Sequence, residues 1–165
     1  MVDISTLSTV IAATSVVIGV VFAVLQLRNL VKTRKTDLVM RLYSTMGSEE
    51  WQKAWYIVWN LEFKDYNDFV KKYGQVTSET SSVNIPFYRI GLFYEGIGVL
   101  LNRKLVDIEL VDDLFHSPIL YTWEKMKPIV EGSRKQFNVK SLEWFEYLYN
   151  EIKKREQKLQ QAPLR

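Results

Sequence analysis

No charged residue lies between Asp3 and Arg28, and almost every position from Val10 to Leu27 is apolar. A helix of about 20 apolar residues crosses a hydrocarbon layer about 30 Å thick. Inside lipid every backbone N–H and C=O group must find a partner within its own segment, so a lone spanning element has to be a helix. The sequence therefore predicts a short N-terminal tail and one transmembrane helix within residues 1–27.

Two other structures share this kind of apolar segment, namely a buried core helix and a cleaved signal peptide. A signal peptide has basic residues before a shorter apolar stretch and small residues at its cleavage site. This chain has Asp3 before the apolar stretch and its basic residues after it. We therefore favour a single-pass anchor in the cell membrane over both alternatives.

Basic residues follow the apolar segment and predict its orientation. Because Lys and Arg near the end of a span stay on the cytoplasmic side, we expect the N-terminus outside and the C-terminal domain in the cytoplasm. Topology and anionic lipid are sufficient reasons for such a cluster, so no nucleic-acid partner is predicted for a chain of net charge +3. The cluster consists of Arg28, Lys32, Arg34, Lys35 and Arg41.

The rest of the 165-residue chain has the length of one ordinary domain. Since it has no cysteine, disulfides, thiolate metal sites and cysteine nucleophiles are excluded. We predict a basic juxtamembrane stalk over residues 28–47, a cytoplasmic helical domain over 48–159 and a flexible tail over 160–165.

Helical spacing and capping residues predict an all-α bundle of about six or seven helices in this domain. The stalk helix ends near Met46, before Gly47, and Ser48 caps the next helix. Ser117-Pro118 resembles a helix start, and Pro128 predicts a kink or restart. The expected helices cover 48–62, 65–74, 85–101, 108–115, 117 onward and 142–159, with a polar loop over 75–83.

Trp51, Trp55 and Trp59 are spaced four residues apart and share one face of their helix. Packing against the stalk and the central helix, 85–101, is the main interpretation. A membrane-interface position for Trp59 and an aromatic ligand site are the alternatives.

Arg89 and Glu95 are charged residues in the otherwise apolar central helix. A buried charge needs a partner, and we expect Arg134 to pair with Glu95, and Glu124 or Glu131 to pair with Arg89. A polar pocket for a small ligand is the alternative role of these side chains.

Motifs for catalysis, metal binding or cofactor binding are not found in the sequence. His116 is the single histidine, and its nearby Asp112 and Asp113 do not have the spacing of a metal motif. Three glycines of the central helix follow no strand, so we interpret them as points of close helix approach rather than a phosphate loop. We predict no catalytic residue, no metal and no cofactor. The three glycines are Gly91, Gly96 and Gly98.

Small residues recur at intervals of three and four within the apolar segment. Such spacing allows close approach of helices in lipid, although small residues are common in membrane helices generally. Self-association into a homo-oligomer and ordinary composition explain this face equally well. The residues are Ser8, Ala12, Ser15, Gly19 and Ala23.

Three stretches occur in the order FYEGIGVLLNRKLVDIELVDDLF, WEKMKPIV and Arg134. This order resembles DUF4760, an uncharacterised membrane-associated family of bacteria and archaea. The resemblance implies membrane anchorage and a helical cytoplasmic domain, and it assigns no activity. The matching residues are Glu95, Gly98, Trp123, Pro128 and Arg134.

Together these features predict a membrane-anchored helical interaction or regulatory module without catalytic activity, whose partners are the lipid bilayer and a protein that the sequence does not identify. The alternative is a small-molecule sensor or enzyme that uses Arg89, Glu95 and Arg134.

Overall fold

A computed structural model describes residues 3–78, 81–137 and 139–161, except for the side chains of residues 6, 7, 9 and 10. The described residues form six helices and no strand, which confirms the predicted all-α class. The chain divides into two compact units, Met1–Leu38 and Val39–Arg165. Of the predicted flexible tail, residues 160 and 161 are helical and 162–165 lie outside the described residues.

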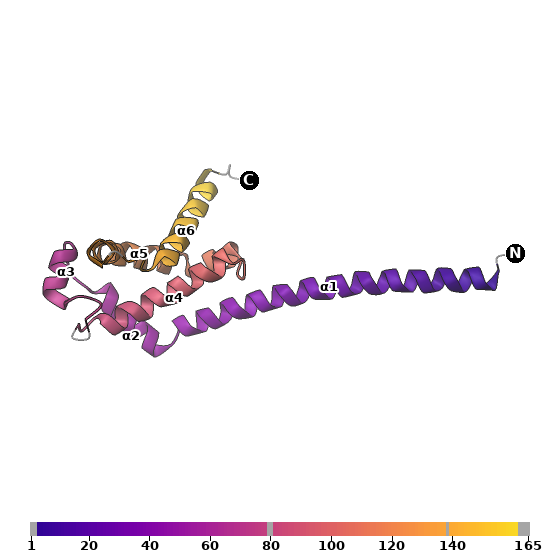
Figure 1. The fold of residues 1–165 in the computed structure, drawn as a ribbon, viewed down its shortest axis with the longest axis horizontal. Coiled ribbons are helices and arrows are strands. Elements are labelled where there is room, and N and C mark those ends of the chain that lie inside the picture. The colour runs from indigo at the N-terminus through magenta and orange to yellow at the C-terminus, as the bar shows by residue number, and fades with distance from the viewer. Residues whose placement is uncertain (1–2, 79–80, 138, 162–165) are drawn as a thin grey trace. The chain divides into compact units, whose positions relative to one another are not determined.

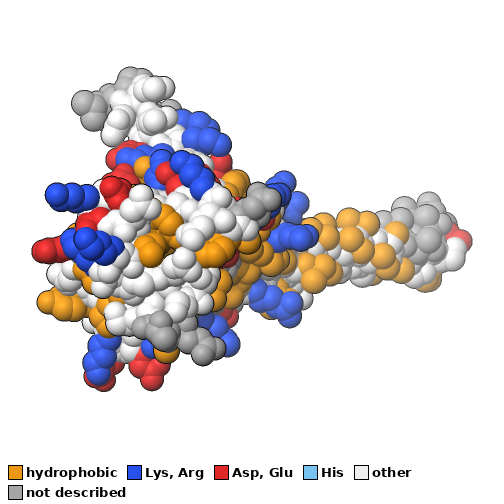
Figure 2. All heavy atoms as spheres, turned by 60° about the vertical axis from the view of Figure 1, so that its left-hand side comes forward, with side chains coloured by type: hydrophobic (Ala, Val, Ile, Leu, Met, Phe, Trp, Pro, Cys, Tyr) orange, Lys and Arg blue, Asp and Glu red, His pale blue; other side chains and the backbone are white. Residues whose placement is uncertain are grey.

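The first unit consists of helix α1, which spans Ile4–Met46 and enters the second unit at Val39. Its most apolar window is long and apolar enough to cross a membrane, and none of that window is buried. The described side chains of residues 11–27 are all exposed, which favours a membrane span over a core helix. Figure 2 shows this part of α1 as a surface of apolar and small side chains without blue or red atoms until the basic residues begin.

The second unit contains the end of α1 and five further helices (Figure 1). Helix α4 packs against both α2 and α6, and α5 packs against α6, α2 and α3. Helix α4 is therefore the central helix that its apolar sequence predicts. The helices are α2 (Glu49–Trp59), α3 (Tyr66–Tyr73), α4 (Asn84–Asn102), α5 (Ile108–Phe137) and α6 (Glu143–Gln161).

Large apolar side chains from every helix of this unit fill its core. Trp123, Tyr94, Phe115 and Phe145 are almost fully buried. The Tyr94 and Phe145 rings stack with their centroids 4.7 Å apart, which joins α4 to α6. Burial of this aromatic surface is the main source of stability for a cysteine-free unit of this size.

Helix α5 is longer than the sequence predicts, because it continues through Pro118 and Pro128. The predicted helix start at Ser117 and a restart at Pro128 are wrong, and with the end of α1 the unit has six helices, within the expected number. A proline inside a helix removes one backbone hydrogen bond and costs about 3 kcal/mol. Buried Ile119, Trp123 and Ile129 lie beside or between the two prolines, and their packing offsets this cost.

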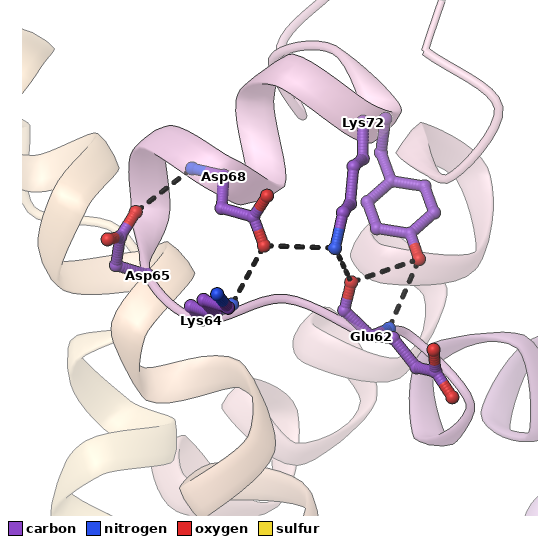
Figure 3. A network of polar contacts seen from close by, with 6 residues as sticks. Glu62, Lys64, Asp65, Asp68 and Lys72 are labelled. Carbon is purple, nitrogen blue, oxygen red and sulfur yellow. Dashed lines mark hydrogen bonds and ion pairs between the residues drawn. The ribbon is translucent and has the colours of Figure 1, made fainter.

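The connection between α2 and α3 is held by a polar network (Figure 3). The Asp65 carboxylate caps α3 by accepting the backbone N–H of Asp68 at 2.9 Å. Asp68 in turn accepts the backbone N–H of Lys64 at 2.9 Å and pairs with Lys72 at 3.0 Å. Lys72 also donates to the backbone carbonyl of Glu62 at 3.0 Å. These bonds explain why Asp65 begins the helix, as its sequence position predicts.

Candidate functional site

Glu95 of α4 lies at the start of α6. Its Oε2 atom accepts the backbone N–H of Phe145 at 2.7 Å. Burial raises the pKa of Glu95, and Glu143 adds to the increase. Hydrogen bonds from the N–H groups of Phe145 and Trp144, together with the charge of Arg134, act in the opposite direction. Glu95 therefore caps a helix that is distant in the sequence.

Helix α6 receives this cap from α4 rather than from the residue that precedes its first turn. The residue before its first turn is Leu142, which has a φ of 54° and an apolar side chain. The first N–H groups of a helix have no partner within the helix, and a left-handed leucine is an uncommon, strained conformation. The helix begins at Glu143, one residue after its predicted start at 142, and a carboxylate from α4 supplies the acceptor.

Arg134 of α5 binds the same segment from another side. Its Nε donates to the backbone carbonyl of Ser141 at 2.8 Å, and its Nη1 lies 2.5 Å from Oε2 of Glu146. The predicted direct pair of Arg134 with Glu95 is thus replaced by a pair with Glu146. Arg134 and Glu95 bind neighbouring residues of α6, so they join the last helix to α5 and to α4.

Two further residues of the resemblance contact the start of α6. A Cβ atom at Gly98 would lie 2.0 Å from the backbone oxygen of Trp144, so only glycine allows this approach. The Trp123 ring meets the Phe145 ring edge-on with centroids 5.0 Å apart. We call Glu95, Gly98, Trp123 and Arg134 the α6 clamp.

The glycines of α4 do not share one role. A Cβ at Gly91 would lie 2.8 Å from Leu142 Cδ1, so this glycine admits the strained leucine. A Cβ at Gly96 would meet nothing within 4 Å. Close approach is confirmed for Gly91 and Gly98 and is wrong for Gly96, whose face of the helix is exposed.

Arg89 is not a buried charge, because its face of α4 is exposed. Its Nη1 lies 3.3 Å from the backbone oxygen of Glu50 and 3.7 Å from Oε2 of the same residue. The predicted partners Glu124 and Glu131 are therefore wrong. An exposed pair of this kind contributes little to stability, and its place at the start of α2 separates Arg89 from the α6 clamp.

His116 lies inside α5 rather than at a helix junction. Its Nδ1 is 2.6 Å from Oδ1 of Asp112, and the other oxygen of Asp112 accepts Nε of Arg155 at 2.8 Å. Arg155 also lies 3.4 Å from Glu109. This network joins α5 to α6, and no group of metal ligands is found among the described residues. The sequence does not predict the role of Arg155, because its position near the end of a long helix gives no signal of a buried partner.

The three tryptophans of α2 share a face, as their spacing predicts. Trp51 and Trp55 stack at 6.4 Å, and Trp55 and Trp59 stack at 5.3 Å. Trp51 is 5% exposed and packs against α4, whereas Trp59 is 40% exposed and meets Tyr121. The core interpretation therefore holds for one end of the row, while the other end reaches the surface.

An open groove runs beside this row. Its volume is about 510 Å³, and the end of α1, α2 and α5 form its walls. Most of its lining is aromatic or apolar, which is typical of a surface that binds a partner. The lining residues are Tyr43, Met46, Gly47, Trp51, Gln52, Trp55, Tyr56 and Pro118.

A second, more polar groove of about 800 Å³ lies between α3 and α5. Pro128, the remaining residue of the resemblance, lines it together with Lys64 and Lys135. The Tyr66 ring packs over Gly132, where a Cβ would lie 2.1 Å from the ring, and its hydroxyl donates to Gln136 at 2.7 Å. These contacts hold α3 against α5.

The predicted residues of α1 form two sets, the small residues of the apolar segment and the basic cluster that follows it. Arg28, Lys32, Arg34 and Arg41 are exposed, and Lys35 is half-buried. The small residues Ser8, Ala12, Ser15, Gly19 and Ala23 are also exposed. A Cβ at Gly19 would meet nothing within 4 Å. Self-association through this face stays a prediction.

The model of the family described as Domain of unknown function (DUF4760) matches residues 13–152. Since the match covers most of the chain, including the α6 clamp, the protein belongs to this family. No curated protein and no solved structure matches the chain.

Proposed function

We propose that this member of the DUF4760 family is a single-pass membrane protein whose cytoplasmic helical domain is an interaction or regulatory module without catalytic activity. The observation that carries the proposal is the exposed apolar segment of α1, which is long enough to span a membrane. The exposed apolar area of this segment is far larger than the apolar patches that soluble monomers expose to water. A lipid bilayer removes the free-energy cost of exposing this apolar segment to water. The basic residues that follow the segment favour a cytoplasmic domain.

The interaction role is supported by the groove beside α2. Tyr56, which lines this groove, is 66% exposed. Exposed aromatic side chains next to a groove are enriched where proteins bind partners, because they bury much area at a small entropic cost.

The catalytic or sensor alternative is not favoured by the contacts of its residues. Glu95 and Arg134 each bind backbone atoms at the start of α6. Arg89 pairs with Glu50 at the surface. Side chains engaged in this way support the fold, and a ligand would have to compete with these bonds.

The test is alkaline carbonate extraction of membranes that contain the full chain. We expect the chain to remain in the membrane pellet, and we expect Val17→Arg to increase the extracted fraction because a charge at the centre of a span costs about 3 kcal/mol. Leu92→Arg is the matched control, since Leu92 is an equally exposed apolar residue of α4. Release of the unmodified chain, or equal release of both variants, would contradict the proposal.

A cytoplasmic reporter fused after Arg165 tests the orientation. We expect it to be active, and we expect neutralisation of Arg28, Lys32, Arg34 and Lys35 to reduce its activity, because these residues hold their end of the span on the cytoplasmic side. Protection of the domain from protease inside intact cells agrees with this orientation, whereas cleavage from outside overturns it.

A further inference from the structure

The turns of α1 that follow the apolar segment carry four cationic side chains and no acidic one. These are Arg28, Lys32, Arg34 and Lys35, and Asp37 is the first acidic residue after them. Arg28, Lys32 and Arg34 are exposed, while Lys35 is half-buried. Blue side chains follow the apolar surface of α1 in Figure 2. We call these four residues the basic segment.

Helix geometry concentrates the charge of the basic segment. At about 100° of rotation per residue, Arg28, Lys32 and Lys35 fall within about 60° of each other, and Arg34 lies on another side. The rise from Arg28 to Lys35 is about 10 Å. This rise is close to the screening length of about 8 Å at physiological ionic strength, so a charged surface at the end of the apolar segment would act on all four residues.

We propose that the basic segment binds the headgroups of anionic phospholipids and enriches them around α1. The inference rests on the proposed membrane span, because the span places Arg28 directly beside the headgroups. Long basic side chains can extend along the helix towards a phosphate while their stems stay against apolar surface. A topology signal alone requires only that the charges stay in the cytoplasm. Binding predicts, in addition, a measurable enrichment of anionic over neutral lipid around α1.

The test uses the full chain in vesicles of phosphatidylcholine with a minority of phosphatidylglycerol. Since the chain has no cysteine, Leu30→Cys gives one site for a donor fluorophore within the basic segment. Energy transfer is measured to acceptor-labelled phosphatidylglycerol and, separately, to acceptor-labelled phosphatidylcholine. We expect the anionic lipid to be enriched about fivefold, the effect of one basic residue at such a surface, and high salt to reduce the enrichment.

Variants identify the residues responsible. Combining Arg28→Gln, Lys32→Gln, Arg34→Gln and Lys35→Gln should abolish the preference, whereas Lys32→Arg with Lys35→Arg should keep it. Arg41→Gln is the matched control, because Arg41 is exposed, belongs to the second unit and is farther along the chain from Leu27. Equal transfer to both lipids, or a preference that survives the fourfold change, would overturn the inference.

Flotation of the same vesicles separates the two proposals. Vesicles of pure phosphatidylcholine should carry the chain as well as mixed vesicles do. Co-flotation without lipid preference would overturn the binding of anionic headgroups and leave the span intact. A chain that does not float with either vesicle would overturn both the span and the inference that rests on it.

Discussion

The apolar segment of α1 and the first turn of α6 are both helical, but they depend on different parts of the chain. The segment of α1 is exposed and closes its backbone hydrogen bonds within itself. The first turn of α6 depends on Glu95 from α4 and Arg134 from α5. The comparison teaches that composition can specify a helix that needs only a suitable solvent, whereas a helix start in a packed domain can depend on residues far away in the sequence.

Gly98→Ala should cause the largest loss of stability, because it disrupts the packing of α4 against the start of α6. The new Cβ would meet the backbone oxygen of Trp144 at 2.0 Å, and a backbone atom cannot rotate away. We expect the free energy of unfolding of the full chain in detergent micelles to fall by about 3 kcal/mol, the upper part of the range for overpacking. Denaturant titration followed by tryptophan fluorescence measures it.

Gly96→Ala is the matched control on the same helix, since its Cβ would meet nothing within 4 Å. We expect its stability to be unchanged or higher by up to about 1 kcal/mol, because alanine is the better helix former. Equal losses in the two variants would show that α4 does not approach α6 as closely as described.

Arg134→Met should have the next largest effect. It removes the bonds to the Ser141 carbonyl and to Glu146 while keeping most of the apolar volume. Hydrogen bonds to charged groups contribute about 1.5–3 kcal/mol each in favourable cases, and partial exposure reduces the total to about 2 kcal/mol. Lys135→Met changes an exposed neighbour, and its stability should stay within about 0.5 kcal/mol. A loss of stability no larger than that of the control would show that Arg134 does not stabilise the start of α6.

Glu95→Ala should cost about 1–2 kcal/mol, the usual effect of losing a helix cap. Glu95→Gln keeps an oxygen that accepts the Phe145 N–H, so this variant should lose less stability than Glu95→Ala. The same denaturant titration gives both values. If the glutamine variant is as unstable as the alanine variant, the negative charge rather than the acceptor is what α6 requires.

The pH dependence of stability tests the environment of Glu95. Because its pKa is raised above the ordinary value of 4.5, the folded chain binds this proton more tightly than the unfolded chain. Its contribution to stability should therefore fall as the pH rises through the interval between the ordinary and the raised pKa. The difference in unfolding free energy between the unmodified chain and Glu95→Gln should follow this trend. A difference that grows with pH over that interval would contradict burial as the dominant cause.

Gly19→Leu should have the smallest effect on unfolding. A Cβ at this position would meet nothing of the chain within 4 Å, so the stability of the second unit should not change. If the small-residue face associates in lipid, the variant should reduce chemical cross-linking between chains. Unfolding that responds to Gly19→Leu would show that the two regions are not independent.

The sequence predicts elements whose determinants are local. The end of α1 at Met46 agrees with its expected boundary, and the Ser48 hydroxyl accepts the Trp51 N–H at 3.3 Å as a cap should. The burial of Trp51 also follows from its spacing in α2. Each of these features depends on residues within a few positions of one another.

The sequence did not predict features that depend on packing. Pro118 and Pro128 read as helix boundaries because local propensity disfavours proline, yet burial along α5 outweighs that preference. The opposite charges of Glu95 and Arg134 predict a direct pair, whereas each of them binds a backbone atom at the start of α6. These charges do not indicate that the start of a distant helix needs a hydrogen-bond partner. The left-handed conformation of Leu142 has no recognisable local pattern in the sequence.

The most direct test of the membrane account is cysteine labelling in inside-out membrane vesicles. Because the chain has no cysteine, Val17→Cys and Asn150→Cys each provide one reactive thiol, and both positions are exposed. With a membrane-impermeant maleimide, we expect Asn150→Cys to react in intact vesicles and Val17→Cys to react only after denaturation in SDS, since lipid covers the span. Reaction of Val17→Cys as fast as Asn150→Cys in intact vesicles would contradict the central claim that α1 crosses the membrane.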